Sequence, residues 1–515
     1  MDASNSFSPS EIGDIVKKIN KKDFKLQNRL FLSKFKKYLD PNNYNNNIEA
    51  NIPKEKTVSL YKVFEGYLTL LRKQILDENR KNIKYKDNIK WVLTIPPLFD
   101  KKGHQFMRDI AYKVGMNNID IALEPEAASL AIFEHKKIKE ENITLNKGNS
   151  FIVVDAGGYT VDISAHKILD DNNNLEQLIY PESMVKGSNF INEGIIKIIE
   201  DIYGKEVIQD AINNDFDNWE STLKEIEEQK INIGKIDKIE SKDIKGIKIP
   251  IKFKTNLKDE LDKKYNCNKT YFCYLIKWVC KTSEIKSCET DKNITFSKSE
   301  IFIPINIIVE IINKLAEDIS HGISDIYTQI EGESPNTIVL TGGFSECKKL
   351  EEKLKEIMIK KKTIKKIVFL TQPQETVAKG AAIYGVRPNQ ILKVRCPFTV
   401  VIETLYFSDN DSDKDNCEKE TETGKFICSK NVTVARMQES VKVNDIRTEE
   451  IIPSSEKIKI FYLEKPDSID EIELDDKNVF LNHTKISVSM KFSNCIRITI
   501  GKKKDNEKII YYPQY

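Results

Sequence analysis

The sequence predicts an α/β protein that ends in a β-rich module, and three observations support this fold class. Two apolar, strand-like runs each end in a pair of glycines, within residues 151–158 and 337–343. Two helix-like segments, 124–131 and 376–385, are rich in small residues that allow close packing. After residue 394, short alternating runs separated by turn clusters are typical of antiparallel strands.

The composition bounds the size and the partners of the protein. With 515 residues, the chain is long enough for more than one domain or lobe. Its 81 Lys and Arg nearly balance 79 Asp and Glu, so no overall field attracts nucleic acid and we expect no nucleic-acid partner. No apolar run is long enough to span a membrane.

The targeting and cysteine patterns predict a cytoplasmic protein. Residues 1–6 lack the basic and apolar stretches of a secretory signal. The nine cysteines are scattered, and no pair has the C-x-x-C spacing of a zinc site. We therefore expect free thiols in a reducing compartment.

The first elements alternate between helix and strand. A Lys-rich helix is expected over 8–39, and an amphipathic helix over 57–79, where apolar residues recur at helical spacing. Trp91–Ile95 is an apolar strand that ends at two prolines, and Asp100 is a suitable N-cap for the next helix. A second short strand, Ile119–Leu123, follows that helix.

Glu124 stands where this second strand meets the first small-residue helix. The helix begins Glu-Pro-Glu-Ala-Ala-Ser-Leu-Ala, and Pro125 fits its first turn. An acid at such a junction either caps the helix or faces a cleft. The residues alone leave both interpretations open.

Residues 151–164 are the most informative stretch of the chain. A buried strand that ends at Asp155 breaks at Gly157 and Gly158, then resumes as a second strand that contains Asp162. A tip without side chains lets N–H groups approach a phosphate, and the two carboxylates can hold hydrated Mg²⁺. An ordinary hairpin with a Gly-Gly turn explains the pattern about equally well.

The middle of the chain is predicted to be mainly helical. Gly187 precedes an Ile-rich helix, and a later helix places Glu227 and Lys230 three residues apart on one side. Residues 236–253 alternate Lys with Ile, as a half-buried strand does, and a long helix is expected over 305–326.

The second glycine pair follows the apolar strand at 337–341. Gly342 and Gly343 precede another helix, and a helix start exposed by glycines can seat an anion or a ligand. This signal is weak by itself, because many strand–helix turns use glycine. The small-residue helix at 376–385 then mirrors the one at 124–131.

These motifs, in this order, resemble the actin-like ATPase fold of actin, sugar kinases and the 70-kDa heat-shock proteins. Within that superfamily, the sequence is most similar to the atypical branch called heat shock 70 kDa protein 12. The similar segments are Trp91-Val-Leu-Thr-Ile-Pro-Pro, Gln105-Phe-Met-Arg-Asp-Ile-Ala-Tyr, Ile121-Ala-Leu-Glu-Pro-Glu-Ala-Ala-Ser, Val154-Asp-Ala-Gly-Gly, Leu340-Thr-Gly-Gly-Phe-Ser-Glu, Ala378-Lys-Gly-Ala and Ile391-Leu-Lys-Val-Arg.

The resemblance implies two lobes around a nucleotide cleft, with ATP or ADP and Mg²⁺ as cofactors. It also implies chaperone-related partners, either client proteins or co-chaperones. It divides the chain into a partial lobe I (1–148), lobe II with the phosphate hairpin and adenosine loop (149–365), a return strand with a connecting helix (366–393) and a β-rich module (394–515).

The resemblance further implies a role for each matching residue. Glu124 and Asp155 would be the catalytic acids, and Asp155 would also lie beside the metal. A lysine of lobe I in the family corresponds to Lys36 or Lys37. The nucleotide-binding positions implied by the resemblance are Gly157, Gly158, Tyr159, Thr160, Asp162, Gly187, Glu227, Lys230, Gly342 and Gly343.

Three features depart from the family pattern. Tyr159 stands where a third glycine is usual, so it must keep a negative φ or bear strain, and its ring crowds the phosphates. The first phosphate hairpin, Asp-x-Gly-Thr, is missing, because only Gly13 and Gly66 precede Gly103 and neither follows an apolar strand with an acid. The linker and peptide-clamping domain of standard chaperones are not evident.

The missing hairpin predicts an incomplete lobe I, an unpaired sheet edge and poor ATPase activity. A start at an internal Met or a degenerate gene copy would explain it. Three functions follow: a heat-shock-70-like ATP-binding protein with weak or lost hydrolysis, a non-catalytic interaction protein of the same fold, and a sugar kinase of the same fold. The sugar kinase fits least well, because Leu123-Glu-Pro-Glu-Ala-Ala-Ser resembles the chaperones.

Overall fold

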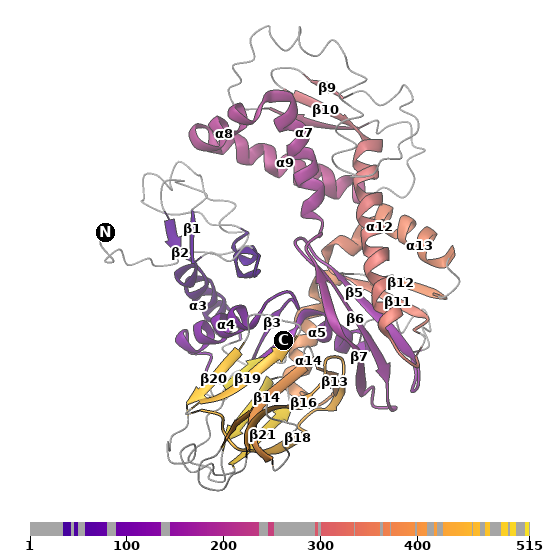
Figure 1. Ribbon diagram of the computed structural model, residues 1–515. Coiled ribbons are helices and arrows are strands. Elements are labelled where there is room, and N and C mark those ends of the chain that lie inside the picture. Colours follow the sequence, from indigo (N-terminus) through magenta and orange to yellow (C-terminus); the bar gives the residue numbers. More distant parts are fainter. Residues whose placement is uncertain are drawn as a thin grey trace.

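The computed structural model shows a mixed α/β protein with a β-rich C-terminal module, so the predicted fold class is confirmed (Figure 1). The structure describes residues 34–42, 46–49, 57–79, 89–134, 145–235, 246–251, 294–296, 300–333, 335–360, 364–370, 372–396, 399–408, 417–419, 426–455, 457–463, 469–473, 486–492, 495–500 and 510–513. In this part of the chain, no helix is long and apolar enough to cross a membrane.

A seven-stranded mixed sheet forms the centre of the molecule, in the order β12-β11-β5-β6-β7-β13-β17. β5, β6 and β7 form an antiparallel meander, while β11 pairs parallel to β5 and β12 pairs parallel to β11. The strands are β5 (Ser150–Ala156), β6 (Val161–Ile168), β7 (Leu175–Met184), β11 (Thr337–Thr341), β12 (Lys366–Phe369), β13 (Ile391–Arg395) and β17 (Ser440–Lys442).

The central strands are apolar because both of their faces are covered. Every residue of β5 and β11 is buried, as expected for strands with helices on both sides. One face packs on Ile-rich helices, and the other packs on the two small-residue helices. The glycine hairpin at 151–164 therefore projects from a sheet whose central strands are fully buried.

Helices of the middle segment cover one face of this sheet and extend beyond its end (Figure 1). A small three-stranded sheet, β8-β10-β9, lies with them at the top of the figure. The elements are α7 (Asn189–Tyr203), α8 (Lys205–Asn214), α9 (Phe216–Gly234), β8 (Gly246–Pro250), β9 (Thr295–Phe296), β10 (Glu300–Pro304), α12 (Ile305–Gln329), η4 (Gly343–Glu346) and α13 (Lys348–Lys360).

The N-terminal elements form a separate layer with its own core. Its described sheets are two-stranded: β1 pairs antiparallel to β2, and β3 pairs parallel to β4. Aromatic residues of its helices pack edge to face, and the ring centroids of Phe35 and Phe64 lie 5.1 Å apart. The elements are η1 (Phe35–Leu39), β1 (Asn47–Glu49), β2 (Thr57–Ser59), α3 (Leu60–Glu78), β3 (Trp91–Ile95), α4 (Lys101–Lys113), β4 (Ile119–Leu123), α5 (Glu124–Ala131) and η3 (Ile132–Glu134).

The predicted elements agree with this layer where it is described. The predicted helix at 57–79 is α3, and the Asp100 side chain caps α4 by accepting from the Gly103 N–H at 2.9 Å. The helix expected over 8–39 lies mostly outside the described residues, and its described end is the 3₁₀ helix η1.

The two small-residue helices cross at direct backbone contact. These are α5 and α14 (Thr376–Val386), which follows the short helix η5 (Pro373–Glu375). A Cβ added at Gly380 would lie 1.7 Å from the Ala127 carbonyl oxygen. Only glycine lets the helices approach this closely, which explains the small-residue pattern of both segments.

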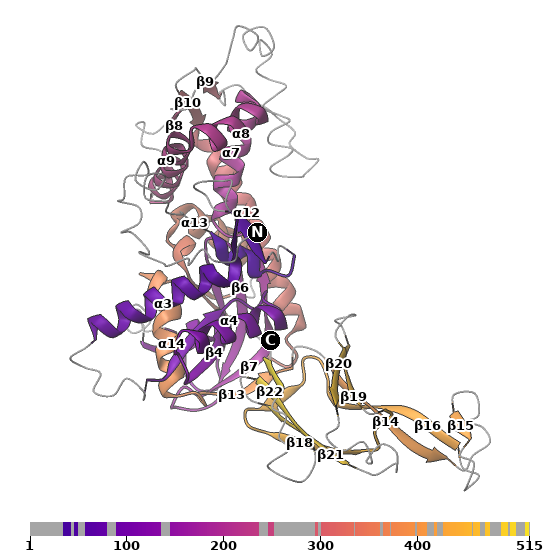
Figure 2. The ribbon, with the colours of Figure 1, turned by 90° about the vertical axis from the view of Figure 1, so that its left-hand side faces the viewer.

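The C-terminal module is a pair of antiparallel sheets that share one apolar core (Figure 2). Its first sheet has the order β15-β16-β14-β19-β20 and its second has the order β18-β21-β22-β23. The strands are β14 (Thr399–Ser408), β15 (Cys417–Lys419), β16 (Phe426–Ala435), β18 (Ile446–Ile451), β19 (Lys457–Leu463), β20 (Ile469–Glu473), β21 (Ile486–Phe492), β22 (Cys495–Ile500) and β23 (Ile510–Pro513).

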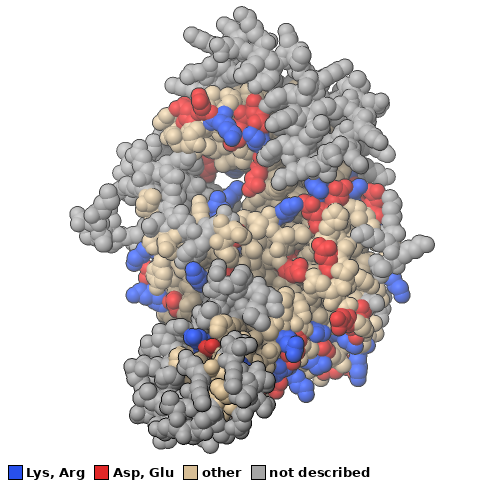
Figure 3. Space-filling model, viewed as in Figure 1, with Lys and Arg blue, Asp and Glu red and all other residues tan. Residues whose placement is uncertain are grey.

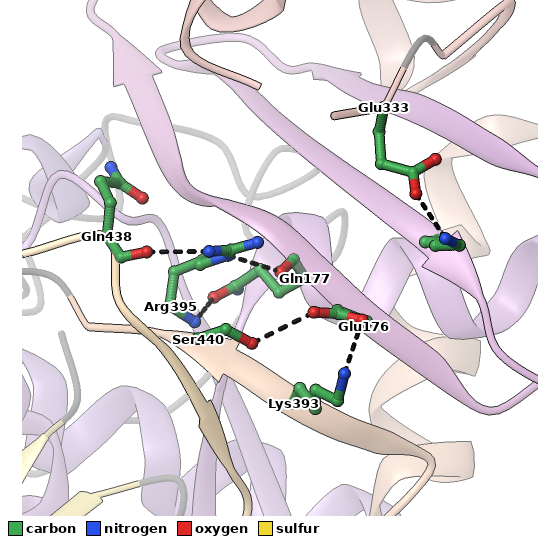
Figure 4. Close-up of polar contacts among 8 residues, drawn as sticks. Glu176, Gln177, Glu333, Lys393, Arg395, Gln438 and Ser440 are labelled. Carbon is green, nitrogen blue, oxygen red and sulfur yellow. Dashed lines mark hydrogen bonds and ion pairs between the residues drawn. The ribbon is translucent and has the colours of Figure 1, made fainter. Parts of the chain in front are cut away.

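Strand β17 joins this module to the central sheet, and polar contacts reinforce the junction (Figure 4). Glu176 of β7 binds the Lys393 amine at 3.0 Å and the Ser440 hydroxyl at 3.1 Å. Arg395 donates from its backbone N–H to the Gln177 side chain at 2.7 Å, and from its guanidinium to the Gln438 carbonyl at 3.0 Å. The module is therefore continuous with the sheet that carries the phosphate hairpin.

The expectation of free thiols is wrong for one pair of cysteines. Cys417 and Cys428 lie opposite each other in the β15–β16 pair and form a disulfide. Among the described residues, Cys347 and Cys396 are free and buried. Cys267, Cys273, Cys280 and Cys288 lie outside the described residues.

Gly380→Ala should destabilise the protein, although glycine-to-alanine usually stabilises a helix by up to about 1 kcal/mol. The added methyl group meets the Ala127 backbone, so we expect a loss of about 2 kcal/mol or more in the free energy of unfolding, measured with urea. Ala382→Ser on the exposed side of α14 is the control and should change it by less than about 0.5 kcal/mol. Equal stability of both variants would contradict the close crossing.

Peptide mapping without reductant should find Cys417 linked to Cys428. Cys347 and Cys396 should resist alkylation in the folded protein, because both are buried, and should react after denaturation. Recovery of alkylated Cys417 from the native, unreduced protein would show that the pairing is incorrect.

Candidate functional site

The structure brings three predicted acids together at the mouth of the glycine hairpin 151–164. Glu124 begins α5, while Asp155 and Asp162 are directly paired residues of β5 and β6. One carboxylate oxygen from each of the three lies within 4.8 Å of the others. Because Glu124 follows a strand of the N-terminal layer, this acid cluster forms where the two layers meet.

The two aspartates of the acid cluster are buried, and burial raises the pKa of both. Burial, and then the charge of Glu124, raise the pKa of Asp155 to about 7, although Lys36 opposes the shift. Burial, Glu124 and Asp155 also raise the pKa of Asp162. Three carboxylates this close repel one another, so a cation stabilises their charged forms.

Lys36 supplies part of that positive charge. Its amine forms an ion pair with Glu124 and projects from η1 into the space beside the acids. Desolvation by surrounding atoms lowers the pKa of Lys36, but Glu124, Asp162 and Asp155 outweigh this effect and the net shift is upward. The structure thus favours Lys36 over Lys37, whose amine lies 5.0 Å from the Tyr38 ring centre.

The donor set of the acid cluster fits Mg²⁺. Magnesium is bound in proteins by one or two carboxylates, with waters and phosphate oxygens completing an octahedron. Asp155 is the best placed of the three, because the Thr160 and Ser183 hydroxyls already donate to Asp162 and Lys36 pairs with Glu124.

The hairpin tip is held by the loop that precedes α7. The N–H groups of Gly187, Ser188 and Asn189 donate to the carbonyls of Tyr159, Gly157 and Gly158, at 2.9, 3.0 and 2.9 Å. A Cβ at Gly187 would lie 2.4 Å from the Gly158 backbone, so the loop can approach only as glycine.

The carbonyls of Gly157, Gly158 and Tyr159 are thereby occupied, while the Gly158 amide remains available. Gly158 is exposed, and its N–H has no acceptor within the part of the chain that the structure describes. An outward amide on a glycine tip is the type of donor that binds phosphate oxygens.

Gly342 and Gly343 lie on the other side of the hairpin. Gly342 has a φ of 80°, and a Cβ there would lie 2.4 Å from the Asp155 carboxylate and from the Ala156 carbonyl. The positive φ and the lack of room for a Cβ both require glycine at position 342. A Cβ at Gly343 would be in ordinary contact with Gln374, at 3.7 Å. The predicted adenosine loop therefore begins directly beside the acid cluster.

Glu227 and Lys230 form an ion pair on α9, with nitrogen and oxygen 2.8 Å apart. Asn192 of α7 donates to Glu227 at 2.6 Å, and the Lys230 amine lies 3.4 Å from the Ser188 hydroxyl. Burial raises the pKa of Glu227, but the bonds from Lys230 and Asn192 outweigh it and the net shift is downward. This pair joins α9 to the loop that carries Gly187.

Asn192 is a polar group that sequence reasoning missed. It is 7% exposed, and its side-chain oxygen has no hydrogen-bond partner among the described residues. Asp40 and Ser183 were also missed, since neither lies in a glycine motif. Figure 3 shows a hollow between the helices of the middle segment and the N-terminal layer, with basic and acidic side chains at its rim.

Tyr159 adopts a negative φ, because it is not among the described residues with positive φ. The strain that its position could impose is therefore avoided. Its hydroxyl reaches the N-terminal layer and donates to Asp40 at 2.8 Å.

The unliganded protein should lose stability as pH rises from about 4 to about 7. The pKa of Asp155 is about 7 in the folded chain against 3.8 ordinarily, so the folded state holds its proton longer and ionisation costs stability in this window. Asp155→Asn removes this cost. Without Mg²⁺, the free energy of unfolding of Asp155→Asn should increase relative to that of wild type by about 2 kcal/mol between pH 5 and pH 8.

Urea unfolding at several pH values measures this difference. Asp171→Asn, at an exposed turn, is the matched control and should show no such trend. An Asp155→Asn advantage that shrinks as pH rises would contradict the raised pKa.

No family model matches the chain, but curated relatives do. Heat shock 70 kDa protein 12A of Homo sapiens is 25% identical over 236 residues, which cover 35% of this chain and 35% of that protein. The mouse protein of the same name gives nearly the same match, 25% over 237 residues. Heat shock 70 kDa protein 12B of Homo sapiens is 21% identical over 410 residues, which cover 68% of this chain and 56% of that protein.

The matches span about a third to just over half of the length of these relatives. The identity of these matches is low, but the structure has the features that the resemblance implied. These are a mixed central sheet with a glycine hairpin and two crossed small-residue helices. The chain is therefore similar, at low identity, to the heat shock 70 kDa protein 12 proteins over these shares of its length.

Proposed function

We propose that this chain is a heat-shock-70-like protein that binds ATP or ADP together with Mg²⁺ in the space between its two layers. The observation that carries the proposal is the acid cluster of Glu124, Asp155 and Asp162, against which Gly342 packs. A phosphate chain with its metal would meet the carboxylates and the hairpin tip, and the adenosine would extend toward Gly342 and α9.

The roles of the side chains follow from their positions. Asp155 would hold the metal through its water shell, and Glu124 would orient a water for attack on the terminal phosphate. Lys36 would neutralise charge on the phosphates once the nucleotide competes for its ion pair with Glu124. Glu227 and Lys230 would contact the ribose, and the open oxygen of Asn192 would accept a hydroxyl or amine hydrogen.

Hydrolysis is proposed to be weak or lost. The described sheets of the N-terminal layer are the pairs β1–β2 and β3–β4, and no second glycine hairpin faces the acid cluster from that layer within the described residues. Phosphoryl transfer depends on positioning and charge neutralisation from both sides. A site with one phosphate hairpin would bind the nucleotide more effectively than it would hydrolyse it.

A non-catalytic interaction protein is the second candidate, and Tyr159 is the observation that favours it. The tyrosine occupies a position that the family gives to glycine and contacts the opposite layer through Asp40. In that case the fold would present a surface to clients or co-chaperones, without turnover.

Two further assignments complete the proposal. The division at residues 148, 365 and 393 stays a proposal, as does the cytoplasmic location. The Cys417–Cys428 disulfide is unusual for that compartment, so mapping it in protein taken directly from cells would test the location as well.

Asp155→Asn should weaken Mg²⁺-dependent nucleotide binding at least 10-fold, because the amide cannot hold the metal's water shell as a carboxylate does. Titration of a fluorescent ATP analogue at pH 8 measures this, with Asp171→Asn as the surface control. Failure of the wild-type chain to bind nucleotide would reject the proposed function.

Measured phosphate release tests the non-catalytic candidate. Turnover in wild type that is lost in Asp155→Asn would reject the non-catalytic protein. Tight binding without turnover would support it.

A further inference from the structure

The strongest feature that has no role in the proposed nucleotide binding is the hydrogen bond between Tyr159 and Asp40. It joins residues 119 positions apart, one at the hairpin tip and one directly after η1, at 2.8 Å. The contact crosses from the central sheet to the N-terminal layer. It therefore holds together two surfaces that must separate if a nucleotide is to pass between them.

Both ends of this bond are fixed to their own layer. Asp40 is fully buried, and its other carboxylate oxygen accepts from the Asn42 backbone N–H at 2.9 Å. The Tyr159 carbonyl accepts from the Gly187 N–H at 2.9 Å. A tyrosine ring between two anchored points is a short rigid strut, because it has only two rotatable side-chain bonds.

The strut acts on the segment that presents Lys36. Asp40 follows Lys36 by four residues, at the end of a single short helix. At the other end of that helix, Lys34 has a φ of 53° and lies near enough to Glu227 and Lys230 for their charges to affect its pKa, which desolvation lowers overall. The segment 34–40 therefore pairs with the acid cluster through Lys36, and its first residue lies within electrostatic reach of Glu227 and Lys230.

We propose that Tyr159 and Asp40 form a latch that keeps η1 closed over the phosphate hairpin and limits the rate at which nucleotide enters and leaves. The latch rests on the proposed function, because it regulates the same site. Tyr159 is a positioning residue in this proposal: it holds Lys36 near Glu124 through η1, and its hydroxyl takes no part in the chemistry.

Tyr159→Phe tests the latch, because it removes only the hydroxyl. Tyr38→Phe is the matched control: it lies on η1, and its hydroxyl makes no hydrogen bond within the described residues. In the nucleotide-free protein, amide hydrogen exchange in residues 35–42 should become about 10-fold faster in Tyr159→Phe and remain unchanged in Tyr38→Phe.

Stopped-flow measurements with a fluorescent ADP analogue and Mg²⁺ supply the second readout. Association and dissociation should both accelerate about 5-fold or more in Tyr159→Phe, while Kd changes less than about 3-fold, because a gate acts on both rates.

Each result decides the proposal. If amide exchange becomes faster in Tyr159→Phe but nucleotide association and dissociation rates do not change, the hydrogen bond has only a structural role and the latch is overturned. Unchanged amide exchange would overturn it as well. If the wild type binds no nucleotide, the proposed function fails and the latch with it. Normal binding with wild-type rates in Tyr159→Phe overturns the latch alone.

Discussion

The structure depends on how three carboxylates, two of them buried, are brought together and how their negative charge is compensated. Glu124, Asp155 and Asp162 come from two layers of the molecule, and burial together with their mutual repulsion raises the pKa of both aspartates. Such an arrangement is unfavourable for folding unless positive charge approaches it. Lys36 offers one such charge, and a hydrated metal ion would offer more.

Close backbone contacts place the elements around these carboxylates. Gly380 lets α14 touch α5, which carries Glu124; Gly187 lets its loop touch the hairpin tip; and Gly342 packs on Asp155. None of these three positions has room for a methyl group without a shift of the backbone or of the Asp155 carboxylate. The glycines therefore set the geometry of the site, although they have no side chains to offer to a ligand.

Much of the fold followed from local pattern, whereas several contacts of the site did not. Strands 151–155 and 337–341 and the crossed helices were predictable, because apolar runs, glycine pairs and small residues are contiguous in sequence. The Tyr159–Asp40 bond and the choice of Lys36 over Lys37 depend on how distant segments approach. The Cys417–Cys428 disulfide was mispredicted, because only strand register places the two cysteines opposite each other.

The most direct measurement is a crystal structure of the chain with ADP and Mn²⁺, in which anomalous scattering locates the metal. The account predicts one ion beside Asp155, bound through water or a carboxylate oxygen, with the phosphates between the hairpin tip and Lys36 and the adenosine beside Gly342. A nucleotide bound elsewhere, or a metal that avoids the three carboxylates, would contradict it.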